Sequence, residues 1–155
     1  MKMLFIMLVW LFIAPDHVFN SEYRSQTFID PTGTYILKGK FQNSVLKGRY
    51  GEIRVKLLDS TSIAMTFYMN SGYPNYFAGA FIDTLMYDGT SAIYSCSEQK
   101  IYKINFRFSN DEVELSQLYE DPHSSCGFES GVIVSGAIKK YSKDTPVIKP
   151  IRTGS

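Results

Sequence analysis

The sequence predicts an all-β fold: an antiparallel eight-stranded barrel preceded by a signal peptide. Short runs rich in Val, Ile, Tyr and Phe recur about every ten to twelve residues, separated by Gly, Asn, Asp and Ser, which is the spacing of a barrel or sandwich. The chain contains 11 Tyr and 11 Phe, residue types that suit half-buried strands. No segment shows a competing helical period.

The first 20 residues have the pattern of a signal peptide. Lys2 supplies a positive start, residues 3–14 are uninterruptedly apolar, and Pro15-Asp16 ends the run. This run of 12 residues is shorter than the roughly 20 that a membrane-spanning helix needs, so we expect no permanent membrane span. The mature protein should be secreted or periplasmic. Residues 21–33 have no period and form a leader into the domain.

Eight candidate strands lie within a β domain at 34–142. In chain order they are 34–38, 50–58, 62–69, 79–87, 91–96, 100–108, 112–119 and 131–141. Alternation is clearest in the second, where apolar Ile53, Val55 and Leu57 interleave with charged residues. Residues 39–48 either extend the first strand or form a loop.

Turn signals predict three hairpins. Polar connections at 59–61, 88–90 and 109–111 each separate two candidate strands, and the second contains Asp88-Gly89, a strong hairpin signal. Closing the sheet into a barrel would remove its two free edges. A two-sheet sandwich is the alternative, because strand number and spacing fit both. Residues 143–155 contain two prolines and no apolar period, so we expect a flexible tail.

The two cysteines are expected to pair. An exported protein with exactly two cysteines usually oxidises them, which predicts a Cys96–Cys126 disulfide. The alternative makes Cys126 a nucleophile with His123 as its base, but no third residue can be assigned to orient this histidine.

The composition argues against nucleic-acid binding, a metal or cofactor site, and enzymatic activity. With 16 basic and 15 acidic residues the net charge is +1, so nothing indicates nucleic acid as a partner. One mature histidine and one cysteine pair cannot make a zinc site, and we expect no metal, cofactor or enzymatic activity. A carboxylate hydrolase using Asp83, Glu114 and Glu120 ranks last among the hypotheses, because such residues usually form solvated surface.

Two surface patches and one loop are candidate binding regions. Residues 109–121 carry Asp111, Glu112 and Glu114 without any Lys or Arg, whereas residues 38–56 are mainly basic. Cross-strand charge pairing is the simpler interpretation of both patches. The loop 71–77 contains Tyr73, Tyr76 and Phe77, which would either cover one end of a barrel or recognise a partner.

The motifs Cys126-Gly127-Phe128, Gly131-Val132 and Lys139-Lys140-Tyr141, with the stretch GYPNYFAGAFIDTLMYDG, resemble a group of small exported bacterial β-barrel proteins of unassigned function. In size, export, β content and disulfide, the chain is also similar to the periplasmic and membrane-bound lysozyme inhibitors. That similarity implies an eight-stranded barrel that inserts a loop into an enzyme cleft. No inhibitory motif of that family can be matched to residues here, and a lipid-attachment cysteine is absent.

The leading functional hypothesis is therefore an exported, non-enzymatic binding protein with a protein or glycan partner, a lysozyme being the most concrete one. The candidate contact residues are Tyr73, Tyr76, Phe77, Asp111, Glu112 and Glu114. The alternative is a carrier of a small apolar ligand in the barrel interior. Large inward residues such as Phe67, Phe106 and Phe108 favour a filled core instead.

Overall fold

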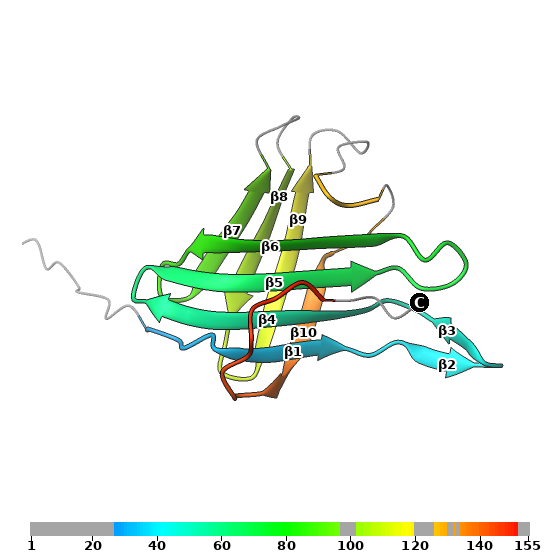
Figure 1. Cartoon of the computed structure of the whole chain (residues 1–155), viewed down its shortest axis with the longest axis horizontal. Helices are drawn as coiled ribbons and strands as arrows, with labels where there is room; N and C mark the ends of the chain where they lie inside the picture. The colour runs from blue at the N-terminus through cyan, green and yellow to red at the C-terminus, as the bar shows by residue number, and fades with distance from the viewer. Residues whose placement is uncertain (1–26, 97–101, 120–125, 130–131, 133, 152–155) are drawn as a thin grey trace, which may run out of the picture.

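The computed structural model describes residues 27–96, 102–119, 126–129, 132 and 134–151, and within them every regular element is a strand (Figure 1). The predicted signal peptide at 1–20 and residues 21–26 of the leader lie outside these residues. The strands are β1 Gly33–Leu37, β2 Lys40–Gln42, β3 Val45–Lys47, β4 Tyr50–Asp59, β5 Ser62–Asn70, β6 Ala78–Met86, β7 Ser91–Cys96, β8 Tyr102–Phe108, β9 Glu112–Tyr119 and β10 Gly136–Ser142.

Eight of these strands form one antiparallel sheet that is nearly closed into a barrel, which confirms the predicted fold class. Their order is β6-β5-β4-β1-β10-β9-β8-β7, while β2 and β3 form a separate two-stranded sheet. Figure 1 shows β1, β4, β5 and β6 running side by side in front, with β7, β8, β9 and β10 crossing behind them. The first strand pairs with the last, as in the register Tyr35↔Lys140.

Two of the three predicted hairpins are confirmed. The β4–β5 ladder runs from Tyr50↔Asn70 to Asp59↔Ser62, and the Asp59 carboxylate accepts hydrogen bonds from the Thr61 N–H and the Ser62 hydroxyl within the turn. The β8–β9 ladder runs from Tyr102↔Tyr119 to Phe108↔Val113. In its turn the Ser109 hydroxyl accepts a hydrogen bond from the Glu112 N–H at 3.2 Å. Polar turn residues that bond nearby backbone groups therefore stabilise both connections.

The third predicted hairpin, between 79–87 and 91–96, is wrong. Its turn forms as expected, because the Asp88 carboxylate accepts hydrogen bonds from the N–H groups of Thr90 and Ser91. The strands it joins separate at once, however, and only the bridge Tyr87↔Ala92 links them. β6 pairs with β5, and β7 pairs with β8. The barrel is therefore split between β6 and β7.

Residues 39–48, whose structure the sequence left open, form the β2–β3 hairpin. Asn43 and Ser44 both have positive φ, 51° and 62°, which is the backbone of a two-residue type I′ turn. The last strand also begins later than predicted, at Gly136 rather than 131. Val132 and Val134 precede it as buried, non-strand residues.

The core lies between the two crossing halves of the sheet. Phe67 is fully buried, and its ring centroid lies 5.2 Å from that of Phe81, 5.9 Å from that of Phe106 and 5.7 Å from that of Phe128. Phe81 also stacks on Tyr94 of β7, with centroids 3.9 Å apart. Aromatic side chains therefore bridge the split that the backbone leaves open.

The predicted disulfide between Cys96 and Cys126 is confirmed, with Cα atoms 5.9 Å apart. Cys96 ends β7, and the segment that follows Cys126 pairs with β6 through the bridge Gly79↔Phe128 and the hydrogen bond from Glu129 N–H to Ala78 O. The disulfide thus joins β7 to a segment held on β6. It is compatible with an oxidising, extracellular compartment.

Residues 143–151 follow β10 without regular structure and cross the outer face of β1 and β4 (Figure 1). Lys149, Pro150 and Ile151 lie beside Glu52 and Arg54 of β4. Within the described residues no helix is long and apolar enough to cross a membrane.

Candidate functional site

The predicted loop Ser71–Phe77 is held by its own backbone. The Ser71 N–H donates to the Phe77 carbonyl over 2.9 Å, and the Tyr76 N–H donates to the Gly72 carbonyl over 2.9 Å. Gly72 has φ of +74°, and a Cβ there would collide with the Gly48 backbone. Only glycine fits this position without moving the chain.

Asn70, at the end of β5, organises the same loop. Its side chain is 5% exposed, and the amide donates to the Tyr76 carbonyl at 2.9 Å and the Tyr68 hydroxyl at 3.2 Å. Its carbonyl oxygen accepts from the Gly72 N–H at 2.8 Å. Sequence reasoning missed this residue, whose only signal is an Asn immediately before a Ser-Gly turn.

The three aromatic residues of the loop have different environments. Tyr73 and Tyr76 are 55% and 42% exposed, and their rings meet edge to face with centroids 6.4 Å apart. Phe77 instead packs against the core. The loop therefore uses one aromatic residue as an anchor and presents the other two to solvent.

The loop is joined to the β2–β3 hairpin. The Tyr73 N–H donates to the Leu46 carbonyl at 3.1 Å, and Tyr73 forms a parallel bridge with Lys47. Both elements project from the same end of the molecule (Figure 1). We call residues 38–50 and 71–77 together the hairpin end. Phe41 of β2 is 75% exposed there.

A groove of about 570 Å³ opens beside the hairpin, between β1, β4 and the C-terminal segment. Its lining includes Ile36, Phe41, Leu46, Tyr50, Tyr68 and Ile151. The rings of Tyr50 and Tyr68 lie 6.2 Å apart. Burial, followed by a hydrogen bond with Tyr68, raises the pKa of Tyr50 to about 12, so its hydroxyl stays neutral at physiological pH.

The hairpin end also carries lysines that have no acidic partner among the residues that the structure describes. Residues 38–51 include Lys38, Lys40 and Lys47 and contain no Asp or Glu. Among the described residues, none of these three amines lies within ion-pair distance of a carboxylate; the Lys38 amine lies 5.2 Å from the Tyr141 ring centroid. Arg49 is held back from this surface by a hydrogen bond to the Ser135 carbonyl at 2.6 Å.

The predicted acidic patch lies elsewhere, at the β8–β9 turn and the start of β9. There the fold sets a cation against each acidic residue: Glu112 is in register with Lys139, Glu114 with Arg107, and the Asp111 carboxylate lies 4.0 Å from the Lys143 amine. The structure therefore does not bring Asp111, Glu112 and Glu114 together with the tyrosine loop.

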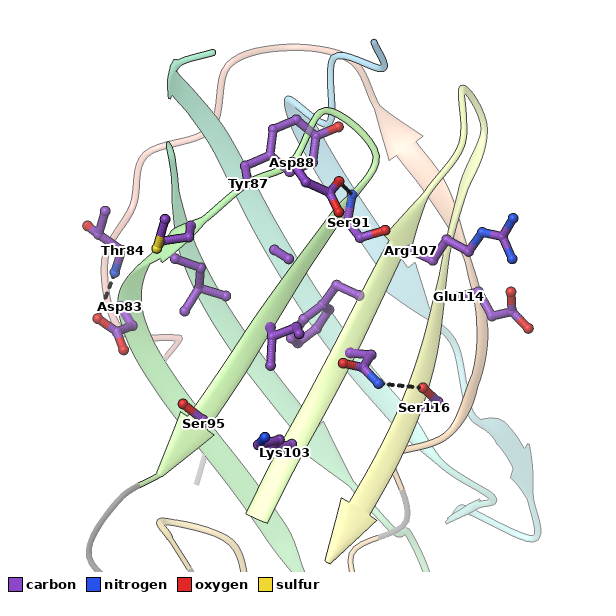
Figure 2. Close-up of a pocket in the computed structure, with 16 residues that line it drawn as sticks. Asp83, Thr84, Tyr87, Asp88, Ser91, Ser95, Lys103, Arg107, Glu114 and Ser116 are labelled. Atoms are coloured by element: carbon purple, nitrogen blue, oxygen red, sulfur yellow. Dashed lines mark hydrogen bonds between the residues drawn. The ribbon is translucent and has the colours of Figure 1, made fainter. Parts of the chain in front are cut away.

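A second groove, of about 900 Å³, lies over the outer face of β7, β8 and β9 and reaches the split beside β6 (Figure 2). Asp83 and Glu114 lie on opposite sides of it, while Glu120 lies outside the described residues. Asp83 accepts a hydrogen bond from the Thr84 N–H at 2.7 Å, and Asn105 donates to Ser116 at 3.3 Å. The charged side chains that line this second groove include both acidic and basic residues.

Other catalytic arrangements gain no support from the described residues. Cys126 is oxidised in the disulfide and so offers no thiolate nucleophile, and His123 lies outside the described part of the chain. No group of three or more His, Cys, Asp or Glu in that part could hold a metal ion.

We compared the chain with protein-family models, curated proteins and solved structures, and none matches. The functional interpretation therefore depends on the geometry of the two surfaces just described. The groove over β7–β9 carries charged side chains of both signs, with Arg107 in register with Glu114. The hairpin end has exposed tyrosines, an exposed phenylalanine and three lysines without an ion-pair partner among the described residues.

Proposed function

We propose that this chain is an exported, non-enzymatic binding protein that engages a protein or glycan partner through the hairpin end. The observation that carries the proposal is the pair Tyr73 and Tyr76, exposed on a loop whose backbone is fixed by Asn70 and Leu46. Exposed aromatic side chains on a rigid loop give contact area at low entropic cost, because little is ordered on binding.

The packing of the interior favours this function over that of an apolar-ligand carrier. Phe67, Phe81, Phe106 and Phe128 contact one another in the space between the two halves of the sheet. A carrier would need room for a ligand where these rings lie. The disulfide supports the exported location, because such bonds persist in oxidising compartments.

A lysozyme is a second candidate partner, and it would bind at the acidic patch of β9 and not at the hairpin end. Because such enzymes are often strongly basic, the acidic patch at Asp111, Glu112 and Glu114 would attract them. The cations facing this patch reduce that attraction. If D111N/E112Q/E114Q leaves the association rate with every lysozyme tested unchanged, this version of the proposal is wrong.

The test of binding uses the oxidised chain as bait against envelope extract, lysozymes and peptidoglycan fragments, read by mass spectrometry. We expect a saturable partner that Y73A/Y76A loses. A matched control, I93A/L118A, removes two exposed apolar side chains from β7 and β9 and should retain it. Equal retention by both variants would exclude the loop as the binding surface.

A further inference from the structure

The charge pattern of the hairpin end indicates what kind of partner it takes. Lys40 and Lys47 lie on the two hairpin strands and Lys38 precedes them, and no carboxylate of the described residues pairs with these amines. The one acidic residue that lines the adjoining groove, Glu52, is paired with Arg54 at 2.6 Å. Lys40 and Lys47 are opposite each other in the β2–β3 register, so their like charges repel, and an anion bound between them would relieve this repulsion. A basic protein such as a lysozyme would be repelled here.

The aromatic residues of the hairpin end indicate a second property of the partner, in addition to its negative charge. Phe41 and Tyr73 are both exposed and both neighbour Leu46: Phe41 is its partner in β2, and the Tyr73 N–H bonds its carbonyl. Tyr50 and Tyr68 line the adjoining groove. The C–H faces of sugar rings pack well on aromatic rings, and tyrosine hydroxyls can hydrogen-bond sugar hydroxyls. A groove of about 570 Å³ is in the range of sites for small ligands.

We propose that the hairpin end binds an acidic glycan chain, with sugar rings against Phe41, Tyr50 and Tyr73 and its anionic groups at Lys38, Lys40 and Lys47. This inference rests on the proposed function and names the chemistry of its partner. The concave groove favours a chain that can enter it over a flat lipid surface. The near-neutral total charge favours a ligand recognised locally over a nucleic acid.

The experiment measures binding of the oxidised chain to alginate, a polyuronate, by titration calorimetry at low salt. Dextran is the neutral glycan control, and a single-stranded oligonucleotide and phosphatidylglycerol vesicles are the other polyanions. We expect saturable binding to alginate, at least tenfold weaker binding to the other three, and weaker alginate binding as salt screens the lysines. Equal affinity for dextran, or tighter binding to the oligonucleotide or vesicles, would overturn the inference.

The matched variants are K38Q/K40Q/K47Q and K56Q/K103Q/K139Q, which remove the same charge from the hairpin end and from other strands. Exposed ion pairs contribute roughly threefold each, so the first variant should lose about thirtyfold in alginate affinity and the second little. Equal losses would contradict a local site.

Repeating the titration and the pull-down with Y73A/Y76A separates this inference from the proposed function. If that variant loses an envelope partner while K38Q/K40Q/K47Q keeps it, the binding function stands and the acidic-glycan inference falls. If Y73A/Y76A and K38Q/K40Q/K47Q both bind the envelope partner and alginate as the parent does, the proposed function and the acidic-glycan inference are both wrong.

Discussion

Asn70 is buried at the end of β5, where its side chain makes three hydrogen bonds that shape the tyrosine loop. We expect Asn70→Ala to lower the free energy of unfolding by about 2 kcal/mol, because it leaves buried polar groups unpaired. It should also weaken partner binding although both exposed tyrosines remain. Urea unfolding and the pull-down measure the two effects.

Asn105→Ala is the matched control, because Asn105 is exposed and its side chain, within the described part of the chain, bonds Ser116 alone. This substitution should change neither the free energy of unfolding nor partner binding appreciably. Full binding by Asn70→Ala, despite its lower stability, would show that the loop does not need to be held rigid.

Asp59 caps the turn between β4 and β5, and Asp88 caps the turn between β6 and β7. Hydrogen bonds from Ser62 and Thr61 lower the pKa of Asp59, and backbone hydrogen bonds from Thr90 and Ser91 lower that of Asp88, from the ordinary 3.8. The unfolded chain therefore binds protons more readily. Stability from these carboxylates is complete above about pH 4 and is lost as pH falls through their lowered values.

We expect the stability difference between the parent and D59N/D88N to be largest at neutral pH and to shrink between pH 4 and pH 2. Denaturant unfolding at pH 7, 4 and 2.5 measures it. A difference that stays constant with pH would mean that these carboxylates are not protected from protonation by the fold.

For single residues, the sequence predicts those roles that depend only on residues nearby in the chain. Asp59 and Asp88 were readable because an aspartate bonds the backbone two or three residues on. Asn70 was not, because its role depends on where the Tyr76 carbonyl returns to meet it.

Among the elements, the Cys96–Cys126 disulfide closes one end of the split by joining β7 to the segment that pairs with β6. We expect C96S/C126S to lower the free energy of unfolding by about 3 to 4 kcal/mol, the chain-entropy value for a separation of 30 residues. Chemical denaturation of the oxidised parent and the variant measures this loss. A loss below about 1 kcal/mol would mean that the ends of the split stay together without the bond.

Local patterns predicted β4–β5 and β8–β9 correctly but failed for β6–β7. The turn signal at Asp88-Gly89 was real, yet whether two strands pair after a turn depends on how the whole sheet closes. Here the stacked rings of Phe81 and Tyr94 bridge the two strands instead. The β2–β3 hairpin was missed because strands of three residues are too short to show alternation.

For the whole molecule, Phe67 marks the place where the two halves of the sheet meet. Phe67→Ala should cost about 3 to 5 kcal/mol, because it leaves a cavity among Phe81, Phe106 and Phe128. Phe41→Ala, on strand β2 where the side chain is 75% exposed, should cost almost nothing. Thermal unfolding by circular dichroism compares them, and similar midpoints would contradict this location of the core.

The charge distribution also shows what the sequence can predict at this scale. The basic hairpin end was visible because its lysines are close together in sequence with no acid between them. The acidic patch looked equally isolated, but the fold brings Arg107, Lys139 and Lys143 to it from other segments. Whether a charged segment lies opposite residues of the other sign depends on the strand pairing, which local sequence does not specify.

The pairing of β1 with β10 has a consequence for how the protein is made. Tyr35 of β1 pairs with Lys140 of β10. β1 can therefore pair with β10, its second neighbour after β4, only when nearly the whole domain has left the ribosome. A nascent chain holding only the earlier strands exposes a hydrogen-bonding edge on β1 and cannot close its sheet. The sheet therefore stays incomplete during synthesis until the last strand has emerged from the ribosome.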